Sequence, residues 1–303
     1  MTELLDELQP AVFAIAYRML GSVSEAEDVV QETLLRVHGA VEDGRQIESP
    51  RAYAATIATR LAIDELRSAR VRRETYVGEW LPEPLVAGVE DDPAQQAELA
   101  ESLSLAFLVL LESLSPEQRA AFLLHDVFDY DYTEIARIVG KSEANTRQLA
   151  SRARRHVEER RPRFEPSSDK RDELADRFFA AARDGELAAL EALLAEDVEL
   201  HGDGGGKVPA LARMLRGRKR VARTLAAWAR QGPRVGAASL RRVEINGLPG
   251  ALVLDSQGRL ISVMAIQIAA GEVRAVNSIV NPDKLQHIGP VGDLRELLAK
   301  RDR

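Results

Sequence analysis

The first half of the chain carries apolar residues at helical spacing, and its helical stretches follow recognisable caps. Ser24-Glu25-Ala26-Glu27 has the pattern of a capping box, followed by Val29, Val30, Leu34 and Leu35 on one side of the expected helix. Ser49-Pro50 places a cap before a proline at the first helical position, and Ser115-Pro116-Glu117-Gln118 is a further capping box. The pattern therefore predicts an all-helical first half.

Residues 131–156 predict two short helices joined by a tight turn. Asp131 caps the first helix, Gly140 supplies the left-handed residue that ends it, and Ser142 caps the second. The second helix carries polar residues at its start and arginines toward its far end, an order typical of a DNA-recognition helix. A plain two-helix corner is the alternative interpretation.

The second half changes from helical to strand patterning. Residues 172–185 and 186–197 are expected to be helical, and a further amphipathic segment lies around Val221–Trp228. Alternating segments then follow at 239–245, 250–255, 260–269 and 272–280, separated by turns such as Asn246-Gly247. Helices followed by antiparallel strands predict an α+β domain with a curved sheet over helices.

Composition narrows the function classes. The chain of 303 residues has no cysteine and only five scattered histidines, so we expect no disulfide, no metal and no cofactor. No apolar run is long enough for a membrane span and the first residues lack an export signal, so a cytoplasmic location is expected. Residues 1–170 carry 20 basic and 31 acidic side chains, against 21 and 17 in residues 171–303. An acidic DNA-reading half should bind duplex poorly without a larger partner.

Three ordered segments of the first half resemble regions 2 and 4 of bacterial extracytoplasmic-function sigma factors. They are YRMLGSVSEAEDVVQET, SPRAYAATIATRLAIDELRS and the segment from SPEQRAAF to SRARRHV. The second half resembles SnoaL-like domains of the nuclear-transport-factor-like superfamily, and WLPEP, DGGGK and NPDKL resemble motifs of the SigJ-type group that carries this extension. The resemblance implies region 2 at 1–73, an acidic linker at 74–93, region 4 with its helix-turn-helix at 94–163, a SnoaL-like cone at 170–286 and a tail at 287–303.

The resemblance implies RNA polymerase core as the larger partner, through the clamp helices of its largest subunit and its flap, together with promoter DNA. The helix that would dock on the clamp helices contributes Glu27, Asp28, Val29, Gln31 and Glu32. A solvated helix face is the simpler interpretation of these residues.

The segment 50–73 would face the −10 element of the promoter, where a base leaves the stack for a pocket formed by loop 39–48. Arg60, Arg67 and Arg70 are the candidate phosphate contacts, although an arginine run at a helix end is also a favourable response to the helix dipole. The linker acids Glu83, Glu90, Asp91 and Asp92 would thread the polymerase channel that later holds RNA, or form a solvated tether.

The recognition helix would enter the major groove of the −35 element. Amide and guanidinium groups form bidentate pairs with adenine and guanine, which makes the start of this helix the place of base reading. The candidate residues for the −35 element are Asn145, Thr146, Arg147 and Gln148 toward the bases, with Arg152 and Arg155 toward phosphates.

For the C-terminal domain, regulation by contact with the sigma units is the expected role, and glycines permit the close approach that such a contact needs. The turn after residue 203 can equally be a plain surface turn. The candidate interdomain residues are Asp203, Gly204, Gly205, Gly206, Lys207, Asn281, Pro282, Asp283, Lys284 and Leu285.

Two other functions remain open at this point. A stand-alone DNA-binding repressor would use the helix pair alone and would bind its operator tightly without polymerase. An enzyme fused to a DNA-binding module would use Asp197, His201, Asp203 and Asn277 in a cavity, with a carboxylate as general base. We find no paired acid and base spacing among these residues, so we expect the chain not to be an enzyme.

Overall fold

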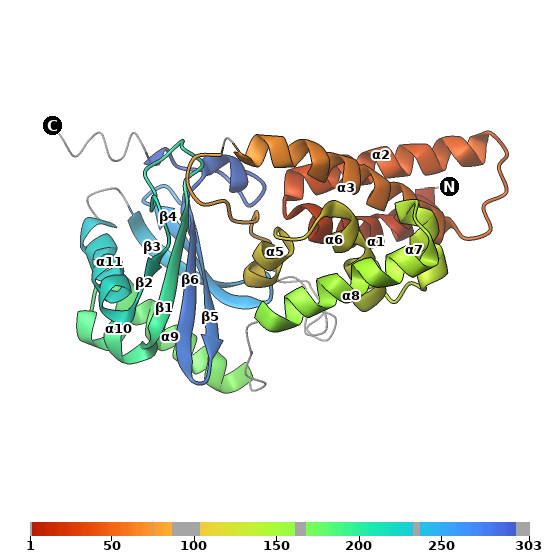
Figure 1. Cartoon of the computed structure of the whole chain (residues 1–303). Helices are drawn as coiled ribbons and strands as arrows, with labels where there is room; N and C mark the ends of the chain where they lie inside the picture. The colour runs from red at the N-terminus through yellow and green to blue at the C-terminus, as the bar shows by residue number, and fades with distance from the viewer. Residues whose placement is uncertain (1, 75, 87–103, 161–167, 233–236, 295–303) are drawn as a thin grey trace. The chain divides into compact units, whose positions relative to one another are not determined.

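The helices expected from the caps form in the computed structural model, which describes residues 2–74, 76–86, 104–160, 168–232 and 237–294 (Figure 1). Contacts divide the chain into two units. The first comprises residues 1–75 and 106–161, and the second comprises residues 76–105 and 162–303. The segment after residue 75 therefore belongs with the C-terminal half, although it follows the first helices in sequence.

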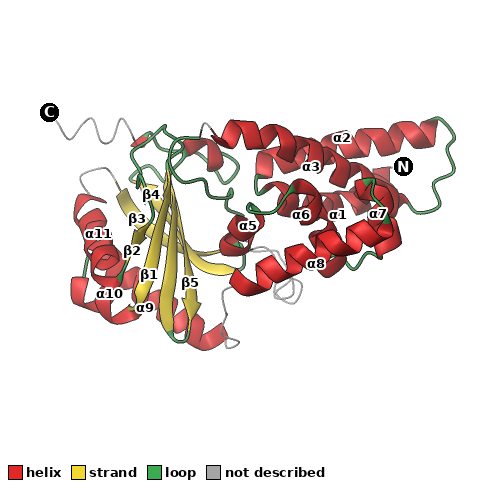
Figure 2. Cartoon of the chain, in the orientation of Figure 1, coloured by secondary structure: helices red, strands yellow, loops and turns green. Residues whose placement is uncertain are grey.

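The first unit is entirely helical in its described residues (Figure 2). Its N-terminal helices α1, α2 and α3 pack against one another, and α6, α7 and α8 form a second group that also contacts α1 and α3. The helices are α1 (Thr2–Leu20), α2 (Val23–Glu42), α3 (Pro50–Glu74), α5 (Leu105–Leu111), α6 (Pro116–Asp126), α7 (Tyr132–Val139) and α8 (Glu143–Arg160).

Most helix starts follow the expected caps, with one correction. Ser115 and Gln118 form the complete capping box, and Asp131 accepts from the backbone N–H of Glu134 at 2.8 Å. The cap of α2, however, is Ser22 and not Ser24: the Ser22 hydroxyl accepts from the Glu25 N–H at 3.2 Å. Both serines precede an acidic residue by three positions, so local pattern does not separate them.

Two buried arginines join the helical groups of the first unit. Arg119 on α6 donates from Nε to the Arg18 carbonyl at 3.1 Å and from Nη1 to Glu112 at 2.5 Å. The Arg18 guanidinium in turn lies 5.3 Å from the centre of the Phe128 ring. Each arginine is only 1% exposed. Because removing a partner of a buried charge is costly, these contacts hold α6 firmly to α1.

The second unit combines helices with one six-stranded sheet, in the order β2-β1-β6-β5-β4-β3, and the sheet is not closed (Figure 2). Helices and sheet in one domain were predicted, and this fold class is confirmed. The elements are α9 (Ser168–Asp184), α10 (Leu187–Leu193), β1 (Leu194–Asp203), β2 (Leu215–Arg216), α11 (Arg218–Gln231), β3 (Ala237–Ile245), β4 (Leu248–Asp255), β5 (Leu260–Ala269), β6 (Glu272–Ile279) and the short 3-10 helix η2 (Pro282–Lys284).

Strand β1 corrects two expectations. The sequence predicted a helix through residue 197, but α10 ends at Leu193 and β1 begins at Leu194. In addition, β1 pairs in parallel with β6, so the sheet is mixed and not purely antiparallel. Its register shifts between Leu194 and Glu199, which interrupts the alternation that would mark a strand. Pairing with a strand some 75 residues away decides this segment, and no local signal reports it.

The sheet separates two apolar cores. Helices α9, α10 and α11 cover one face of the sheet (Figure 1). Their apolar side chains pack there against strand residues such as Val198, Met264 and Val276. The other face carries Val263 and Ile279, and its cover includes Leu81 from the segment after the first unit. Residues 76–86, here named the linker segment, therefore complete the hydrophobic core of the second unit.

Candidate nucleic-acid interface and linker clamp

Helix α8 presents one polar face to solvent. Its buried side consists of Thr146, Ala150, Ala153 and Val157, spaced by four, three and four positions. The opposite side exposes residues at the matching spacing of three, four and three positions, so they lie in one line along the helix. These exposed residues are Asn145, Gln148, Arg152 and Arg155.

The remaining residues proposed for this helix are placed differently. Thr146 is fully buried and its hydroxyl donates to the Ser142 carbonyl at 3.0 Å, so it supports the helix start and does not face a partner. Arg147 is exposed, but it binds Glu143 at 2.5 Å and lies 4.6 Å from the centre of the Tyr132 ring. Of the proposed base-reading residues, only Asn145 and Gln148 are both exposed and on the polar face of α8.

Two arginines of α3 bind the second helical group. Arg60 donates to two carbonyl groups at the end of α7, those of Ile138 at 3.1 Å and of Arg137 at 2.9 Å. Arg67 binds Glu117 of α6 at 2.7 Å. The side chain of Arg70 lies outside the described residues. Both arginines are exposed, so contact with phosphates would require their guanidinium groups to leave these partners, and that role stays a prediction.

The Arg67–Glu117 pair is held electrostatically. Burial alone would raise the pKa of Glu117, but the hydrogen bond and charge of Arg67 outweigh it and lower that pKa below its usual value. The Arg67 side chain is 57% exposed, so solvent screens the pair and its net contribution to stability is small.

Helix α2 carries an acidic surface with an exposed leucine. Glu27, Asp28 and Gln31 are exposed, whereas Glu32 is half-buried and binds Arg36 at 2.6 Å. Leu35 is 58% exposed. The sequence placed Leu35 on the apolar side of the helix, and only the packing shows that it lies outside.

Val29 is the exception among the proposed residues of this helix. It is 6% exposed and belongs to the core of the first unit, so its side chain is not available to a partner. Loop 39–48, proposed as a base pocket, is largely exposed after the end of α2 at Glu42. Its role stays a prediction.

Asp203, at the end of β1, is the centre of a buried polar cluster. The carboxylate is fully buried, and both of its oxygens accept hydrogen bonds from the linker segment. Oδ1 accepts from the Tyr76 hydroxyl at 2.6 Å and from the Gly205 N–H at 3.0 Å. Oδ2 accepts from the Leu81 N–H at 2.8 Å and from Lys284 Nζ at 2.7 Å.

Lys284 binds the same segment from the other side. Its ammonium group donates to the Leu81 carbonyl and lies 4.3 Å from the Trp80 ring and 5.1 Å from the Tyr76 ring. Asn281 donates to the Tyr76 hydroxyl at 3.0 Å. Burial first, and then the Asp203 carboxylate, raise the pKa of Tyr76 far above its usual value, so this hydroxyl stays a donor.

The glycine turn after Asp203 fits closely around these groups. Gly205 and Gly206 have φ of +57° and +69°, which side chains rarely adopt. A Cβ on Gly205 would lie 2.3 Å from Asn281 Nδ2, and one on Gly206 would lie 2.9 Å from Val77 Cβ. Any side chain at these two positions would displace the linker segment or the Asn281 side chain.

The other residues of the NPDKL motif, Asn281–Leu285, differ in how deeply they are buried. Asp283 is exposed and forms an ion pair with Lys207 beside the cluster, with side chains 53% and 52% exposed. Leu285 is fully buried in the core that Leu81 shares, and Pro282 begins η2. The proposed interdomain residues are therefore neighbours in the structure, although some are buried and some are exposed.

Further contacts continue along the linker segment. His201 binds Glu79 through Nδ1 at 2.6 Å, and His287 Nε2 lies 2.8 Å from the Pro84 carbonyl. Leu85 and Asn246 exchange two hydrogen bonds, from the Leu85 N–H to the Asn246 side chain at 2.9 Å and from the Asn246 N–H to the Leu85 carbonyl at 2.8 Å.

The residues of the second unit that hold the linker segment are here named the linker clamp: His201, Asp203, Gly205, Gly206, Asn246, Asn281, Lys284 and His287. Of the linker acids, Glu83 is buried in this unit at 7% exposure. The other three, Glu90, Asp91 and Asp92, lie outside the described residues. Sequence patterns did not identify Tyr76, Trp80 or Leu81 as contacts of Asp203 and Lys284, although WLPEP was noted as a motif.

The four residues considered for catalysis lie in different surroundings in the described part of the chain. Asp197 is exposed and binds Arg274 at 2.9 Å, whereas Asp203 and His201 are part of the linker clamp. Asn277 is buried at 5% exposure, and none of the four lines the cavity described below. This arrangement gives the enzyme hypothesis no support.

Comparison with known proteins agrees with both halves of the chain. The family model Sigma-70 region 2 matches residues 4–72, and Sigma-70, region 4 matches residues 104–157. The ECF RNA polymerase sigma factor SigJ of Mycobacterium tuberculosis is 40% identical over 92% of this chain and 91% of its own length. The chain belongs to the ECF sigma factors.

Other relatives extend this result. The probable ECF RNA polymerase sigma factor SigI of Mycobacterium tuberculosis is 31% identical over 89% of this chain and 90% of its own length. A crystal structure of Mycobacterium tuberculosis SigJ superposes with a TM-score of 0.76 at 37% identity, covering 96% of this chain and 100% of that one. The match includes the C-terminal unit, so the shared architecture is not limited to the sigma regions.

As a sigma factor, the chain has RNA polymerase core and promoter DNA as its partners. In the part of the chain that the structure describes, no helix is long and apolar enough to cross a membrane.

Proposed function

We propose that this sigma factor recognises its promoter through α8 and α3, and that its C-terminal unit controls the geometry of both by holding the linker between them. The linker segment follows α3 and precedes the region that contains α8, so its path limits how far the two DNA-contacting helices can separate. The observation that carries this proposal is the buried Asp203–Lys284 pair, whose charges bind both the N–H and the carbonyl of Leu81. The protein acts in the cytoplasm and supplies no catalytic group of its own.

Recognition of the −35 element rests on the exposed line along α8. Asn145 and Gln148 stand near its start, where side chains reach base edges, and the exposed Arg152 and Arg155 follow toward the far end of the helix as the proposed phosphate contacts. Arg147 can also contact DNA once its salt bridge to Glu143 breaks. Both side chains of this pair are exposed, so breaking it takes little free energy.

Recognition of the −10 element by α3 requires the first unit to open. Arg60 and Arg67 are engaged by α7 and α6 in the described state, and DNA phosphates would replace those partners. Polymerase core supplies the free energy for this separation by binding the two helical groups at different places. Fluorophores placed on α3 and α8 should move apart when core is added, and an unchanged transfer efficiency would remove this step.

Docking on polymerase uses the acidic face of α2. The proposed contacts are Glu27, Asp28, Gln31 and Glu32, together with the exposed Leu35, and Val29 supports the helix from inside. Glu27→Lys and Leu35→Glu should each weaken the association with core. Glu7→Lys, an exposed change on α1, is the matched control and should leave the association unchanged.

The regulatory role is tested by loosening the linker without damaging the sheet. Tyr76→Phe removes a donor to Asp203, and Trp80→Ala removes the ring over Lys284. In transcription with purified core on a cognate promoter, both variants should change the yield of initiated transcript. Asp283→Ala, which breaks only the exposed pair with Lys207, is the control. If Tyr76→Phe and Trp80→Ala both initiate as the unmodified protein does, the clamp is structural and not regulatory.

A further inference from the structure

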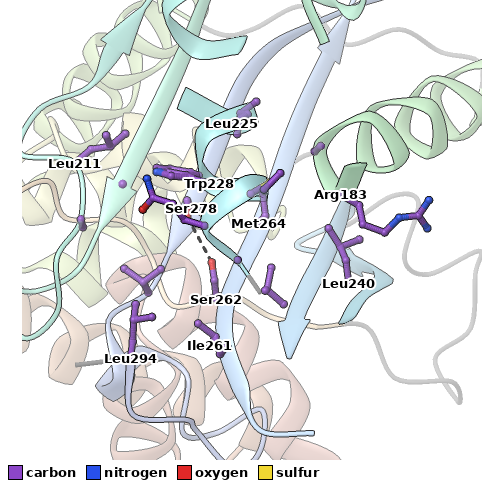
Figure 3. A pocket seen from close by; sticks show the side chains of 18 of the residues that line it. Arg183, Leu211, Leu225, Trp228, Leu240, Ile261, Ser262, Met264, Ser278 and Leu294 are labelled. Atoms are coloured by element: carbon purple, nitrogen blue, oxygen red, sulfur yellow. Dashed lines mark hydrogen bonds between the residues drawn. The ribbon is translucent and has the colours of Figure 1, made fainter. Parts of the chain in front are cut away.

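A cavity of about 530 Å³ lies on the helix-covered face of the sheet in the second unit. It is bounded by the ends of α9 and α11, by β3 to β6 and by the segment Pro209–Leu211. Figure 3 shows Trp228, Leu225 and Met264 around this space, with Arg183 extending away from it. The volume lies in the range of sites that bind small organic molecules.

The lining indicates the chemistry of a ligand. Most of its side chains are aliphatic, Trp228 adds a flat aromatic surface, and none of the described lining residues is a carboxylate or a histidine. Arg183, the only charged residue among the described lining residues, is 62% exposed at the rim and binds Asp184 at 2.7 Å. An apolar cavity of this kind favours an uncharged hydrocarbon or aromatic molecule over water.

Two neighbouring hydroxyl groups of the sheet form a polar point in the cavity, in addition to the polar side chains of Gln231 and Ser239 in its lining. Ser262 on β5 and Ser278 on β6 are 7% and 5% exposed, and their oxygens lie 3.4 Å apart (Figure 3). This separation is long for a hydrogen bond between hydroxyl groups, and the contact of the Ser262 hydroxyl with the Val263 carbonyl is also long at 3.5 Å, so both hydroxyl groups retain capacity for a better partner. A carbonyl or hydroxyl group on the ligand would satisfy it.

The cavity and the linker clamp take neighbouring residues from β1 and from the segment that directly follows β6. Gly202 lines the cavity, and the next residue of β1 is Asp203. Val280 lines it, and the next residue is Asn281. Successive residues of a strand point to opposite faces, so a displacement of the cavity wall also moves a clamp residue.

The glycine turn adds a second connection. A Cβ on Gly202 would lie 3.0 Å from Leu211 Cβ, and one on Gly204 would lie 2.5 Å from the Val208 carbonyl oxygen. The segment 204–211 is therefore packed tightly on itself and on β1. At one end it binds Asp203 in the clamp, and at the other end Leu211 lines the cavity.

We propose that this cavity binds an uncharged, mainly apolar small molecule with one hydrogen-bonding group, and that the bound molecule stabilises the linker in its clamp. The direction follows from the two connections: a ligand in contact with Gly202 and Leu211 holds the neighbouring Asp203 and the turn in place, so it binds more tightly to the state in which the linker is seated. The coupling to transcription rests on the proposed regulatory role of the clamp, whereas binding itself does not.

Binding is tested on the full chain without polymerase, using 6-propionyl-2-(dimethylamino)naphthalene, an uncharged aromatic ketone whose emission shifts to the blue in apolar sites. We expect saturable binding of one molecule per chain. Leu240→Trp fills the cavity from β3 and should abolish it, while Arg241→Trp, the exposed neighbour on the same strand, should not. Ser278→Ala should weaken binding by about two- to tenfold through loss of one hydrogen bond.

Two results would overturn the site: no saturable blue-shifted emission up to the solubility of the probe, or equal affinities of the two tryptophan variants. If Leu240→Trp shows no cooperative thermal unfolding, that variant is not folded and the Ser278→Ala variant tests the site instead. An affinity for the probe that is unchanged in Ser278→Ala then rejects the cavity as the binding site.

The coupling is measured with the two tryptophans of the chain, Trp80 in the linker segment and Trp228 in the cavity. In Trp228→Phe, Trp80 is the only indole, and saturation with the probe should lower its Stern–Volmer constant for acrylamide. An unchanged or raised constant rejects the coupling. If the chain binds the probe but its Tyr76→Phe variant transcribes normally, the proposed regulation is rejected, whereas the binding site is retained.

Discussion

Helix α8 and the linker clamp use polar side chains in opposite ways. On α8 four of the functional candidates stand in one exposed line, and the buried side of the helix supports them with small residues. In the clamp the decisive carboxylate is fully buried and every contact described for it is internal. An exposed polar face serves a partner that arrives from outside, whereas a buried, satisfied cluster specifies one arrangement of the chain's own segments.

The largest expected effect is on the clamp. Asp203→Ala leaves Lys284 buried without its carboxylate, and we expect a loss of roughly 3–5 kcal/mol in the unfolding free energy of the second unit. Asp283→Ala breaks the neighbouring exposed pair with Lys207 and should cost less than about 1 kcal/mol. Denaturant titration followed by tryptophan emission compares the two. Equal losses of unfolding free energy in the two variants would show that burial of the Asp203–Lys284 pair does not increase its contribution to stability.

A smaller effect is expected for base reading by α8. Asn145→Ala and Gln148→Ala should each reduce binding of polymerase holoenzyme to the cognate promoter by about 1–3 kcal/mol and relax preference at a single −35 position. Binding to a panel of promoters with single base changes measures both quantities. An equal loss of affinity on every promoter of the panel would show that these residues contact the DNA backbone and do not read bases.

Arg152→Ala should act differently from the base-reading variants. Removing one phosphate contact weakens binding about equally on all sequences and reduces the slope of log affinity against log salt by about one. Affinity measured at several salt concentrations tests this expectation. If the slope is unchanged while one base position loses preference, Arg152 reads sequence.

The smallest expected effect is the pH dependence of the clamp. Burial alone would lower the pKa of His201, but the hydrogen bond and charge of Glu79, with Glu199, raise it above its usual value. A charged His201 stabilises the folded unit fully below the unfolded pKa of about 6.5, and this contribution is lost as pH rises through the higher folded pKa. Unfolding free energy should therefore fall above about pH 6.5, and His201→Gln should flatten that fall. The same slope in the variant would exclude His201 as its source.

Much of the fold was accessible from local pattern. Asp131, Gly140 and Ser142 mark the helix pair correctly, because each acts within four residues of its own position. Asn246-Gly247 likewise forms a turn with both residues at positive φ between β3 and β4. The Ser22 cap was missed because Ser24 offers the same local pattern two residues later.

The candidate sites were only partly accessible. The sequence predicted α8 as the recognition helix, and that role stays a prediction. Thr146 of α8 and Val29 of α2 are buried and so do not belong to the proposed contact faces, whereas Leu35 is exposed. A residue on the border of a helical stripe faces in or out according to what packs beside it, and its own spacing does not decide that.

The sequence alone determined the helix pair, the caps at Asp131 and Ser115 and the turn at Asn246-Gly247, since caps, periodicity and turn residues act over a few positions. Tertiary structure decided the parallel pairing of β1 with β6, the binding of Arg60 and Arg67 by the second helical group, and the clamp around Asp203. In the clamp, Asp203 lies 127 positions from Tyr76 and 81 from Lys284. Such contacts form only after loop closure has been offset by burial in a common core, and no local pattern encodes which distant groups will meet there.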